Sequence, residues 1–301
     1  MKVAIIGYGK MGQQIAHKLA FYKHEVAVYD LNAAQLEITN DSAITPFANI
    51  NEVINFFESD RVVIWLMIPS VAVESEIENW VPLLKPTSII IDGGNSNFKE
   101  SITRAEKLAP KGIGFIDIGT SGGILGSAEG FSMMVGGNEE DYKFIEPLLD
   151  SLSQPSGSFN YFGPSGSGHF IKMVHNAIEY GYMESLAEGY QLIHEGPFKD
   201  IDLVNVSEVW EKGSIISSKL NSLSGQVFKN NPNLNGVNGV VEQTGEASWA
   251  IDFAKSIDLD LPSIEAALNV RLASKNGKVS FATKLLAELR NKFGGHNINN
   301  K

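Results

Sequence analysis

The chain opens with an apolar run, VAII at residues 3–6, that leads directly into the glycine pattern GYGKMG at residues 7–12. A short Val- and Ile-rich run followed by G-x-G-x-x-G and an amphipathic segment is typical of a strand–turn–helix that binds a dinucleotide. In that pattern Gly7 permits the tight turn, Gly9 lets the backbone approach a pyrophosphate, and Gly12 permits close packing of helix against strand. The alternative is a glycine-rich turn without a ligand. The cofactor-binding residues predicted here are Gly7, Tyr8, Gly9, Lys10, Met11 and Gly12.

The first half of the chain continues this alternation of short apolar runs and amphipathic segments. The runs rich in Val and Ile are residues 3–7, 25–30, 62–69, 88–94 and 114–119, with 132–137 as a further strand candidate. Amphipathic segments such as 11–23 and 73–84 lie between them. Buried parallel strands that alternate with helices predict an α/β, doubly wound, Rossmann-type domain. We assign it to residues 1–164.

The strand signal stops after about Pro164, and the rest of the chain reads as helical. One long helix is expected to begin near Ser165. Further helices are expected over residues 206–223, 248–257, 263–274 and 281–293. The Asn- and Gly-rich stretch 230–245 is predicted to be a loop. We therefore expect an all-α domain over residues 165–301 that binds substrate and ends in a short tail.

Composition excludes several classes of protein. The formal net charge of −11 argues against binding to nucleic acid or to an anionic membrane. No run of eighteen apolar residues is present, so no membrane span is expected, and the N-terminus does not resemble a secretory signal. The absence of cysteine rules out disulfides, thiolate catalysis and Cys-based zinc sites. A cytoplasmic location fits these features.

Asp30 follows the second predicted strand, at the place where a carboxylate accepts hydrogen bonds from the adenosine ribose hydroxyls. A carboxylate there also repels a 2′-phosphate, and neither Leu31 nor Asn32 supplies a compensating cation. These residues predict NAD rather than NADP. The ends of neighbouring strands are expected to contact the cofactor as well, through Leu66, Met67, Ile68 and Asn95. Asn95 is also a candidate substrate ligand, although an Asn in a glycine-rich turn often only holds the turn.

The segment GHFIKMVHNAIEY, residues 168–180, carries an acid/base set on one predicted helix. Its members Lys172, His175, Asn176 and Glu179 fall at i, i+3, i+4 and i+7 and therefore share one stripe. A solvated helix face is the alternative. In a cleft beside a redox cofactor, a buried lysine can serve as a base and a carboxyl group as an acid. No third ligand accompanies His175 and Glu179 at a recognisable spacing, so no metal site is predicted.

This segment closely resembles the signature of the decarboxylating 6-phosphogluconate dehydrogenases. The other matching motifs are GYGKMG at residues 7–12, DGGNS at 92–96, GTSGG at 119–123 and RNKFGGH at 290–296. They run through the chain in the expected order. The length resembles the short form of the family, within the β-hydroxyacid dehydrogenase superfamily, which shares the nucleotide motif and the helix lysine.

The resemblance implies a specific reaction, the NAD-linked conversion of 6-phosphogluconate to ribulose 5-phosphate and CO₂ in the pentose phosphate pathway. It implies that Lys172 takes the proton from the C3 hydroxyl as hydride leaves, and then polarises the ketone so that no metal is needed. It implies that Glu179 supplies the proton after CO₂ is lost. Substrate hydroxyls would be held by His175 and Asn176. The carboxylate end would be held by Ser121, Gly122 and Gly123.

The resemblance also implies the ligands of the substrate phosphate. Arg271 resembles a phosphate ligand of the family, and Tyr180 adds a hydroxyl. Arg290 and His296 are similar to the tail residues that reach into the partner subunit's site, which implies a homodimer or homotetramer and a dimerisation role for the helical domain. The sequence departs from the family at Ser248, where a basic residue is expected. This departure leaves open a weaker phosphate site or a different substrate.

Two other functions remain alternatives. The first is a β-hydroxyacid dehydrogenase that does not decarboxylate, such as one acting on 3-hydroxyisobutyrate, and the absence of a phosphate requirement would identify it. The second is a non-catalytic NAD-binding sensor, which would bind NAD without turnover. The presence of both Lys172 and Glu179 argues against the sensor.

Overall fold

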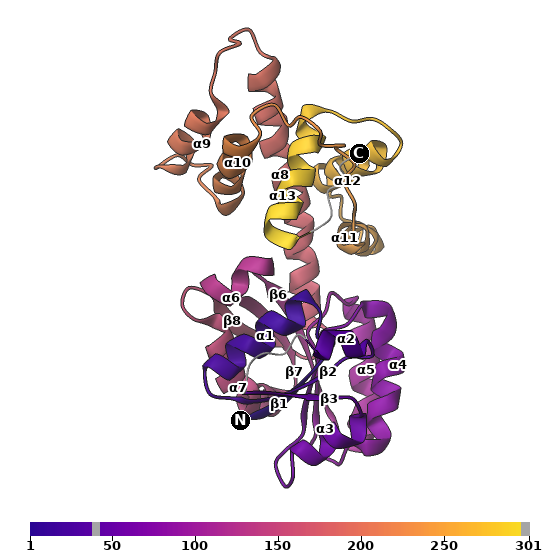
Figure 1. Ribbon diagram of the computed structural model, residues 1–301. Helices are drawn as coiled ribbons and strands as arrows, with labels where there is room; N and C mark the ends of the chain where they lie inside the picture. The colour runs from indigo at the N-terminus through magenta and orange to yellow at the C-terminus, as the bar shows by residue number, and fades with distance from the viewer. Residues whose placement is uncertain (38–42, 296–301) are drawn as a thin grey trace. The chain divides into compact units, whose positions relative to one another are not determined.

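The computed structural model describes residues 1–37 and 43–295. The chain divides into two compact units, Met1–Met173 and Val174–Lys301 (Figure 1). This division falls inside a long helix, whereas the boundary expected from sequence, at residues 164/165, precedes that helix. That domain boundary stays a prediction.

Unit 1 is built on an eight-stranded sheet with the strand order β3-β2-β1-β4-β5-β6-β7-β8. The strands are β1 (Lys2–Ile6), β2 (Glu25–Tyr29), β3 (Ile44–Phe47), β4 (Val63–Leu66), β5 (Ile89–Asp92), β6 (Gly114–Ser121), β7 (Ser132–Gly137) and β8 (Ser158–Gly163). Neighbouring strands are parallel except β6 and β7, which pair antiparallel. The predicted Rossmann-type α/β class is confirmed.

Two edge strands, β3 and β8, were not predicted from the sequence. Strand β3 has only four residues, contains Pro46 and buries one position fully. Strand β8 alternates between exposed and half-buried positions. Since an edge strand can tolerate proline and need not be apolar on either face, its hydrophobic pattern is weak.

Helices cover both faces of this sheet. They are α1 (Lys10–Phe21), α2 (Ala33–Leu36), α3 (Ile50–Phe56), α4 (Ser70–Trp80), α5 (Phe98–Leu108), α6 (Gly126–Glu129) and α7 (Glu139–Ser153), with 3₁₀ turns at Val81–Leu83, Ala109–Lys111 and Gly123–Leu125. Alternate residues of β1 enter two separate cores: Val3 and Ile5 pack with α1 and α7, and Ala4 and Ile6 pack with α3 and α4. The strands are therefore apolar on both faces, as their uninterrupted Val/Ile runs predict.

The long helix α8 spans Ser167–Glu195 and begins close to Ser165, where its start is predicted. Asp117 of β6 anchors this start. Its carboxylate oxygens accept the backbone N–H groups of Gly166 at 2.6 Å and His169 at 2.8 Å. Because a carboxylate at a helix N-terminus satisfies unpaired N–H groups and complements the helix dipole, Asp117 fixes the first turns of α8 on the sheet.

Unit 2 is helical, as predicted. Its remaining helices are α9 (Leu203–Glu211), α10 (Lys219–Asn230), α11 (Glu246–Ser256), α12 (Pro262–Lys275) and α13 (Phe281–Gly294). The single helix expected over residues 206–223 was wrong, because the chain breaks at Gly213, which has φ 87°, and Ser218 caps a new helix. The predicted loop 230–245 connects α10 to α11. Within the described ranges, no helix is long and apolar enough to cross a lipid bilayer.

Candidate active site

The turn after β1 shows why three glycines stand at residues 7, 9 and 12. Gly7 has φ +94°, and a Cβ atom added to it would lie 2.5 Å from the carbonyl oxygen of Met67. A Cβ atom on Gly12 would lie 2.0 Å from the carbonyl oxygen of Gly7. At Gly9, by contrast, a Cβ atom would meet nothing within 4 Å. Gly7 and Gly12 are therefore needed by the fold, whereas Gly9 leaves open backbone at the start of α1, the place where the glycine pattern predicts a pyrophosphate.

Asp30 lies directly after β2, at the same edge of the sheet. Its Oδ2 atom accepts the backbone N–H of Tyr8 at 2.7 Å, and its Oδ1 atom accepts the N–H of Asn32 at 2.8 Å. These bonds fix the carboxylate beside the glycine turn. The Tyr8 side chain is buried, with its hydroxyl 3.3 Å from Nε2 of His17, so it packs against α1 rather than facing outward.

The neighbouring strand ends lie at this edge too. Leu66 is buried at the end of β4, while Met67 and Ile68, which follow it, are half-buried. Asn95 is exposed in the turn after β5. The buried Asp92 holds that turn by accepting the Ser96 hydroxyl at 2.7 Å and by pairing with Arg104. The role of Asn95 toward a ligand stays a prediction, but its turn is rigidly supported.

Gly9→Ala is expected to leave Tm unchanged and to weaken dinucleotide binding. The added methyl group meets no protein atom within 4 Å, but it would stand where a bound pyrophosphate approaches the backbone. Overpacked contacts cost about 1–3 kcal/mol, which corresponds to about 5- to 150-fold in Kd. Calorimetric titration with NAD and a thermal melt measure the two quantities. An unchanged Kd in the folded variant would show that the ligand does not approach this turn.

Lys172 lies in the second turn of α8 and is 8% exposed. Its position depends on a glycine of the GTSGG motif: a Cβ atom on Gly119 would lie 2.2 Å from the Cβ atom of Lys172. Gly168, in the first turn of α8, has equally little room, since an added Cβ atom would lie 2.5 Å from the carbonyl oxygens of Asp117 and Met134. The absence of two side chains thus lets α8 approach the sheet and places the lysine beside the end of β6.

The loop that follows β6 carries the predicted carboxylate ligands. Ser121 is half-buried at the last position of β6, and Gly122 and Gly123 both have positive φ, 131° and 51°. The next segment is held by Lys18 of α1, a residue that sequence reasoning missed. The buried Lys18 ammonium donates to the carbonyl oxygens of Gly126 at 3.2 Å and Ser127 at 2.9 Å, and to that of Gln154. The sequence signal that could have identified Lys18 is its position between the apolar residues of an amphipathic helix, which indicates a buried lysine.

The helix predicted for this segment is confirmed, since Lys172, His175, Asn176 and Glu179 all lie on α8; their roles stay a prediction. In unit 2, Nδ1 of His175 lies 3.0 Å from Oδ1 of Asn176, whose amide nitrogen donates to Oε1 of Glu246 at 3.2 Å. Glu246 is 3% exposed in the first turn of α11 and also accepts the Thr244 hydroxyl. Glu246, which the sequence did not single out, therefore orients Asn176.

A second cluster in unit 2 surrounds Arg271 of α12, which is 2% exposed. Its guanidinium carbon lies 3.4 Å from the centroid of the Tyr180 ring, and its Nη2 atom lies 3.6 Å from Sδ of Met183. Among the described residues, neither Arg271 Nε nor the Tyr180 hydroxyl has a hydrogen-bond partner. Unpaired buried donors on a cation are suited to an anionic ligand.

Arg290 of α13 belongs to the same neighbourhood. It is 6% exposed, and its charge interacts with those of Glu179 and Arg271 in its own chain. Burial lowers the pKa of both arginines from the ordinary value, and nearby Tyr180 opposes the shift. The structure thus brings Tyr180, Arg271 and Arg290 together. His296, predicted beside them, lies outside the described residues.

Ser248, the point of departure from the family pattern, lies half-buried in the first turns of α11. The preceding residue, Ala247, packs in one apolar cluster with Tyr180 of α8 and with Leu268 of α12. Ser248 is therefore next in the chain to Ala247, which packs against the two helices that carry Tyr180 and Arg271. The effect of the missing cation at Ser248 on phosphate binding stays a prediction.

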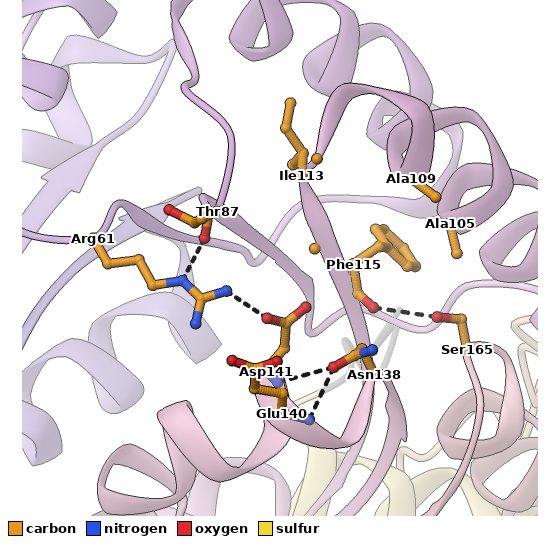
Figure 2. A pocket seen from close by; sticks show the side chains of 12 residues that line it. Arg61, Thr87, Ala105, Ala109, Ile113, Phe115, Asn138, Glu140, Asp141 and Ser165 are labelled. Atoms are coloured by element: carbon orange, nitrogen blue, oxygen red, sulfur yellow. Dashed lines mark hydrogen bonds and ion pairs between the residues drawn. The ribbon is translucent and has the colours of Figure 1, made fainter.

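A cavity of about 590 Å³ lies in unit 1 at the amino-terminal ends of β5 and β6, and thus at the sheet edge opposite the glycine turn. Figure 2 shows the side chains that line it. Arg61 there donates to the carbonyl oxygen of Thr87 and pairs with Asp141, and no predicted site residue lines the cavity. Within residues 1–37 and 43–295, no three His, Asp or Glu side chains group closely enough to hold a metal ion; the metal-free site stays a prediction.

Comparison with known proteins covers the whole chain. Residues 2–163 match the family model for the NAD binding domain of 6-phosphogluconate dehydrogenase, and residues 168–299 match that for the C-terminal domain of the same enzyme. The chain is 36% identical to the Bacillus subtilis protein YqeC over 98% of each chain. It is 33% identical to the NAD(+)-dependent, decarboxylating 6-phosphogluconate dehydrogenase of Haloferax volcanii, over 100% of this chain and 99% of that protein.

Two solved structures resemble the fold. The 6-phosphogluconate dehydrogenase of Plasmodium falciparum matches with a TM-score of 0.84 at 26% identity, over 99% of this chain and 66% of that one. The 3-hydroxyisobutyrate dehydrogenase of Mycobacterium tuberculosis matches with a TM-score of 0.74 at 18% identity, over 95% of this chain and 98% of that one. The second likeness shows the shared fold alone.

Proposed function

We propose that this chain, which belongs to the 6-phosphogluconate dehydrogenase family, oxidises and decarboxylates 6-phosphogluconate to ribulose 5-phosphate and CO₂ with NAD. The observation that carries the proposal is the placement of Lys172. Asp117 anchors the start of α8, and the missing side chain at Gly119 leaves room for Lys172. Lys172 lies on the same helix as His175, Asn176 and Glu179, at the spacing of one stripe. An amine that accepts a proton and a carboxyl group that donates one are the acid/base pair that oxidative decarboxylation needs.

The glycine turn supports NAD as the cofactor. Open backbone at Gly9 and the amino-terminal end of α1 would hold the pyrophosphate, and the fixed carboxylate of Asp30 would accept the ribose hydroxyls. Bound NAD supplies the hydride acceptor. The adjacent Leu31 and Asn32 offer no positive charge to a 2′-phosphate, so we propose NAD over NADP.

Lys172 performs the proton transfers on the substrate oxygen. As hydride leaves C3, the lysine amine takes the proton of the C3 hydroxyl, which gives a 3-keto acid. The protonated lysine then donates a hydrogen bond to the ketone oxygen and stabilises the electron pair released when CO₂ departs. Glu179, two turns along the same helix, protonates the carbon that carried the carboxylate. Each turnover transfers one hydride to NAD and releases one CO₂. Lys172 has then gained one proton and Glu179 has lost one, so a proton returns from the amine to the carboxylate before the next turnover, and no metal is needed.

The remaining predicted residues hold the substrate. Ser121, Gly122 and Gly123 would bind its carboxylate through a hydroxyl and backbone N–H groups. Asn95, His175 and Asn176 would bind its hydroxyls. Tyr180, Arg271 and Arg290 would bind its phosphate, and the unpaired Tyr180 hydroxyl and Arg271 Nε support this assignment among the residues described.

We also propose a homodimer or homotetramer in the cytoplasm, acting in pentose phosphate metabolism. The contribution of Arg290 and His296 to a partner subunit stays a prediction, since Arg290 already interacts with Glu179 and Tyr180 within one chain. Sedimentation velocity with and without an Arg290→Met substitution tests the assembly. Arg290→Met and Lys172→Met chains can also be mixed. Activity regained in the mixed dimers would support the prediction that Arg290 of one chain completes the active site of the other.

The proposed reaction is tested by following NADH formation and CO₂ release from 6-phosphogluconate, with NAD and NADP in parallel. Turnover with CO₂ and an NAD preference is the expected result. Reduction of NAD by a small non-phosphorylated 3-hydroxy acid, without turnover of 6-phosphogluconate, would favour the non-decarboxylating alternative. NAD binding without turnover of either substrate would favour a sensor.

A further inference from the structure

The interior of unit 2 holds a carboxyl group that the proposed reaction does not use. Glu184 lies on α8 one turn after Tyr180 and directly after Met183, the two residues that contact the Arg271 guanidinium. It is 6% exposed, and its Oε2 atom has no hydrogen-bond partner among the residues that the structure describes. An ionised carboxyl group at this depth costs free energy unless it gains a hydrogen-bond partner or takes up a proton.

The surroundings of Glu184 make it able to titrate near neutrality. Burial raises its pKa from 4.5 to about 7, Glu188 on the same helix adds to the increase, and Arg271 of α12 opposes it. Arg271 in turn interacts with Tyr180 and Glu179 of α8 and with Arg290 of α13. Glu184 therefore carries a charge that can be present or absent, and that charge interacts with Arg271, the proposed phosphate ligand.

We propose that Glu184 is a positioning residue that couples anion binding at Arg271 to the uptake of one proton. In the protonated form Glu184 leaves the charge of Arg271 to the ligand. In the ionised form the Glu184 carboxylate attracts the Arg271 guanidinium itself and repels a bound dianion. The inference rests on the phosphate subsite of the proposed function, but it concerns any tetrahedral dianion that binds there.

The direction of the effect follows from linkage. A dianion bound at Arg271 disfavours a second negative charge nearby, so its binding raises the proton affinity of Glu184. The affinity for the dianion is then highest at low pH, where Glu184 is already neutral, and falls as the pH rises through 7. If binding raises the pKa of Glu184 by about one unit, the affinity falls by up to about tenfold between pH 6 and pH 9.

Sulfate is the probe of choice, because it stays a dianion throughout this range and any proton taken up comes from the protein. Calorimetric titration of the full chain with sulfate at pH 7.5, in two buffers that differ in ionisation enthalpy, measures that uptake. The expected result is an uptake of about half a proton per sulfate, the value for a pKa that rises from about 7 by one unit. An uptake near zero in the wild-type chain would overturn the proposal.

Glu184→Gln keeps the shape of the neutral acid and removes the titration. We expect it to abolish the proton uptake and to flatten the pH dependence of sulfate affinity, while affinity at pH 6 stays within about twofold of wild type. Glu208→Gln, on the exposed face of α9, makes the same change of charge and should keep the uptake. Retained uptake in Glu184→Gln would show that another group is responsible.

Arg271→Lys separates this inference from the proposed reaction. Weaker sulfate binding in this variant would place the anion at Arg271 even if 6-phosphogluconate were not turned over. Unchanged sulfate affinity and uptake would place the anion elsewhere and overturn the inference. Conversely, turnover of 6-phosphogluconate without Glu184-dependent uptake would leave the proposed function intact and remove the role of Glu184.

Discussion

Lys172→Met is expected to lower kcat by about 10²–10⁴-fold, the range that a positioned general acid/base contributes. Methionine keeps an unbranched chain of similar length, so the packing against Gly119 is retained while the amine is lost. The Kd for NAD should stay within about twofold, because the adenosine half is expected at Gly9 and Asp30, on different loops of the sheet edge. Initial rates at saturating substrate and a separate NAD titration measure the two effects.

The matched control is Lys278→Met, which removes the same charge from an exposed position. It should retain full activity. A Lys172→Met protein that melts like wild type but still turns over at more than a tenth of the normal rate would remove the lysine from the proton-transfer role. Lost NAD binding in a folded variant would instead place Lys172 in the cofactor site.

Gly119→Ala should reduce both stability and activity. The new Cβ atom would lie 2.2 Å from Cβ of Lys172 and 3.1 Å from the carbonyl oxygen of Gly168, so backbone on β6 or α8 must move. Overpacking of this kind costs about 1–3 kcal/mol, and for a chain of this size each kcal/mol lowers Tm by about 2–4 °C. A displacement of the lysine by about 1 Å can lower kcat by about 10²-fold.

Gly189→Ala provides the contrast, because it lies on the same helix and an added Cβ atom meets nothing within 4 Å. Alanine is favoured over glycine in a helix by about 1 kcal/mol, so this variant should be as stable as wild type or more stable. Thermal melts and kcat values of the two variants test the idea together. A Gly119→Ala enzyme with normal kcat would show that Lys172 tolerates movement of its helix.

The sequence pattern was enough to predict a structural element wherever the element depends on a single continuous segment. The glycine turn at residues 7–12 and the uninterrupted Val/Ile strands predicted a doubly wound sheet, because a strand buried on both faces must be apolar throughout. The stripe from Lys172 to Glu179 followed from helix periodicity alone. Pattern was insufficient for β3 and β8, because edge positions relax the demand for apolar residues. It was also insufficient for the break at Gly213, which lies inside the run 206–223 that the pattern predicts as one helix.

What the sequence could not supply is the set of groups that hold the site in place, and these come from segments far apart in the chain. Asp117 fixes the start of α8 from a strand about fifty residues earlier, Lys18 ties down the loop after β6, and Glu246 orients Asn176 from another helix. Periodicity and motif spacing thus determined the fold class, the cofactor turn and the acid/base stripe. Only the tertiary structure decided which buried polar groups meet, because a buried charge finds its partner in space rather than at a fixed sequence spacing.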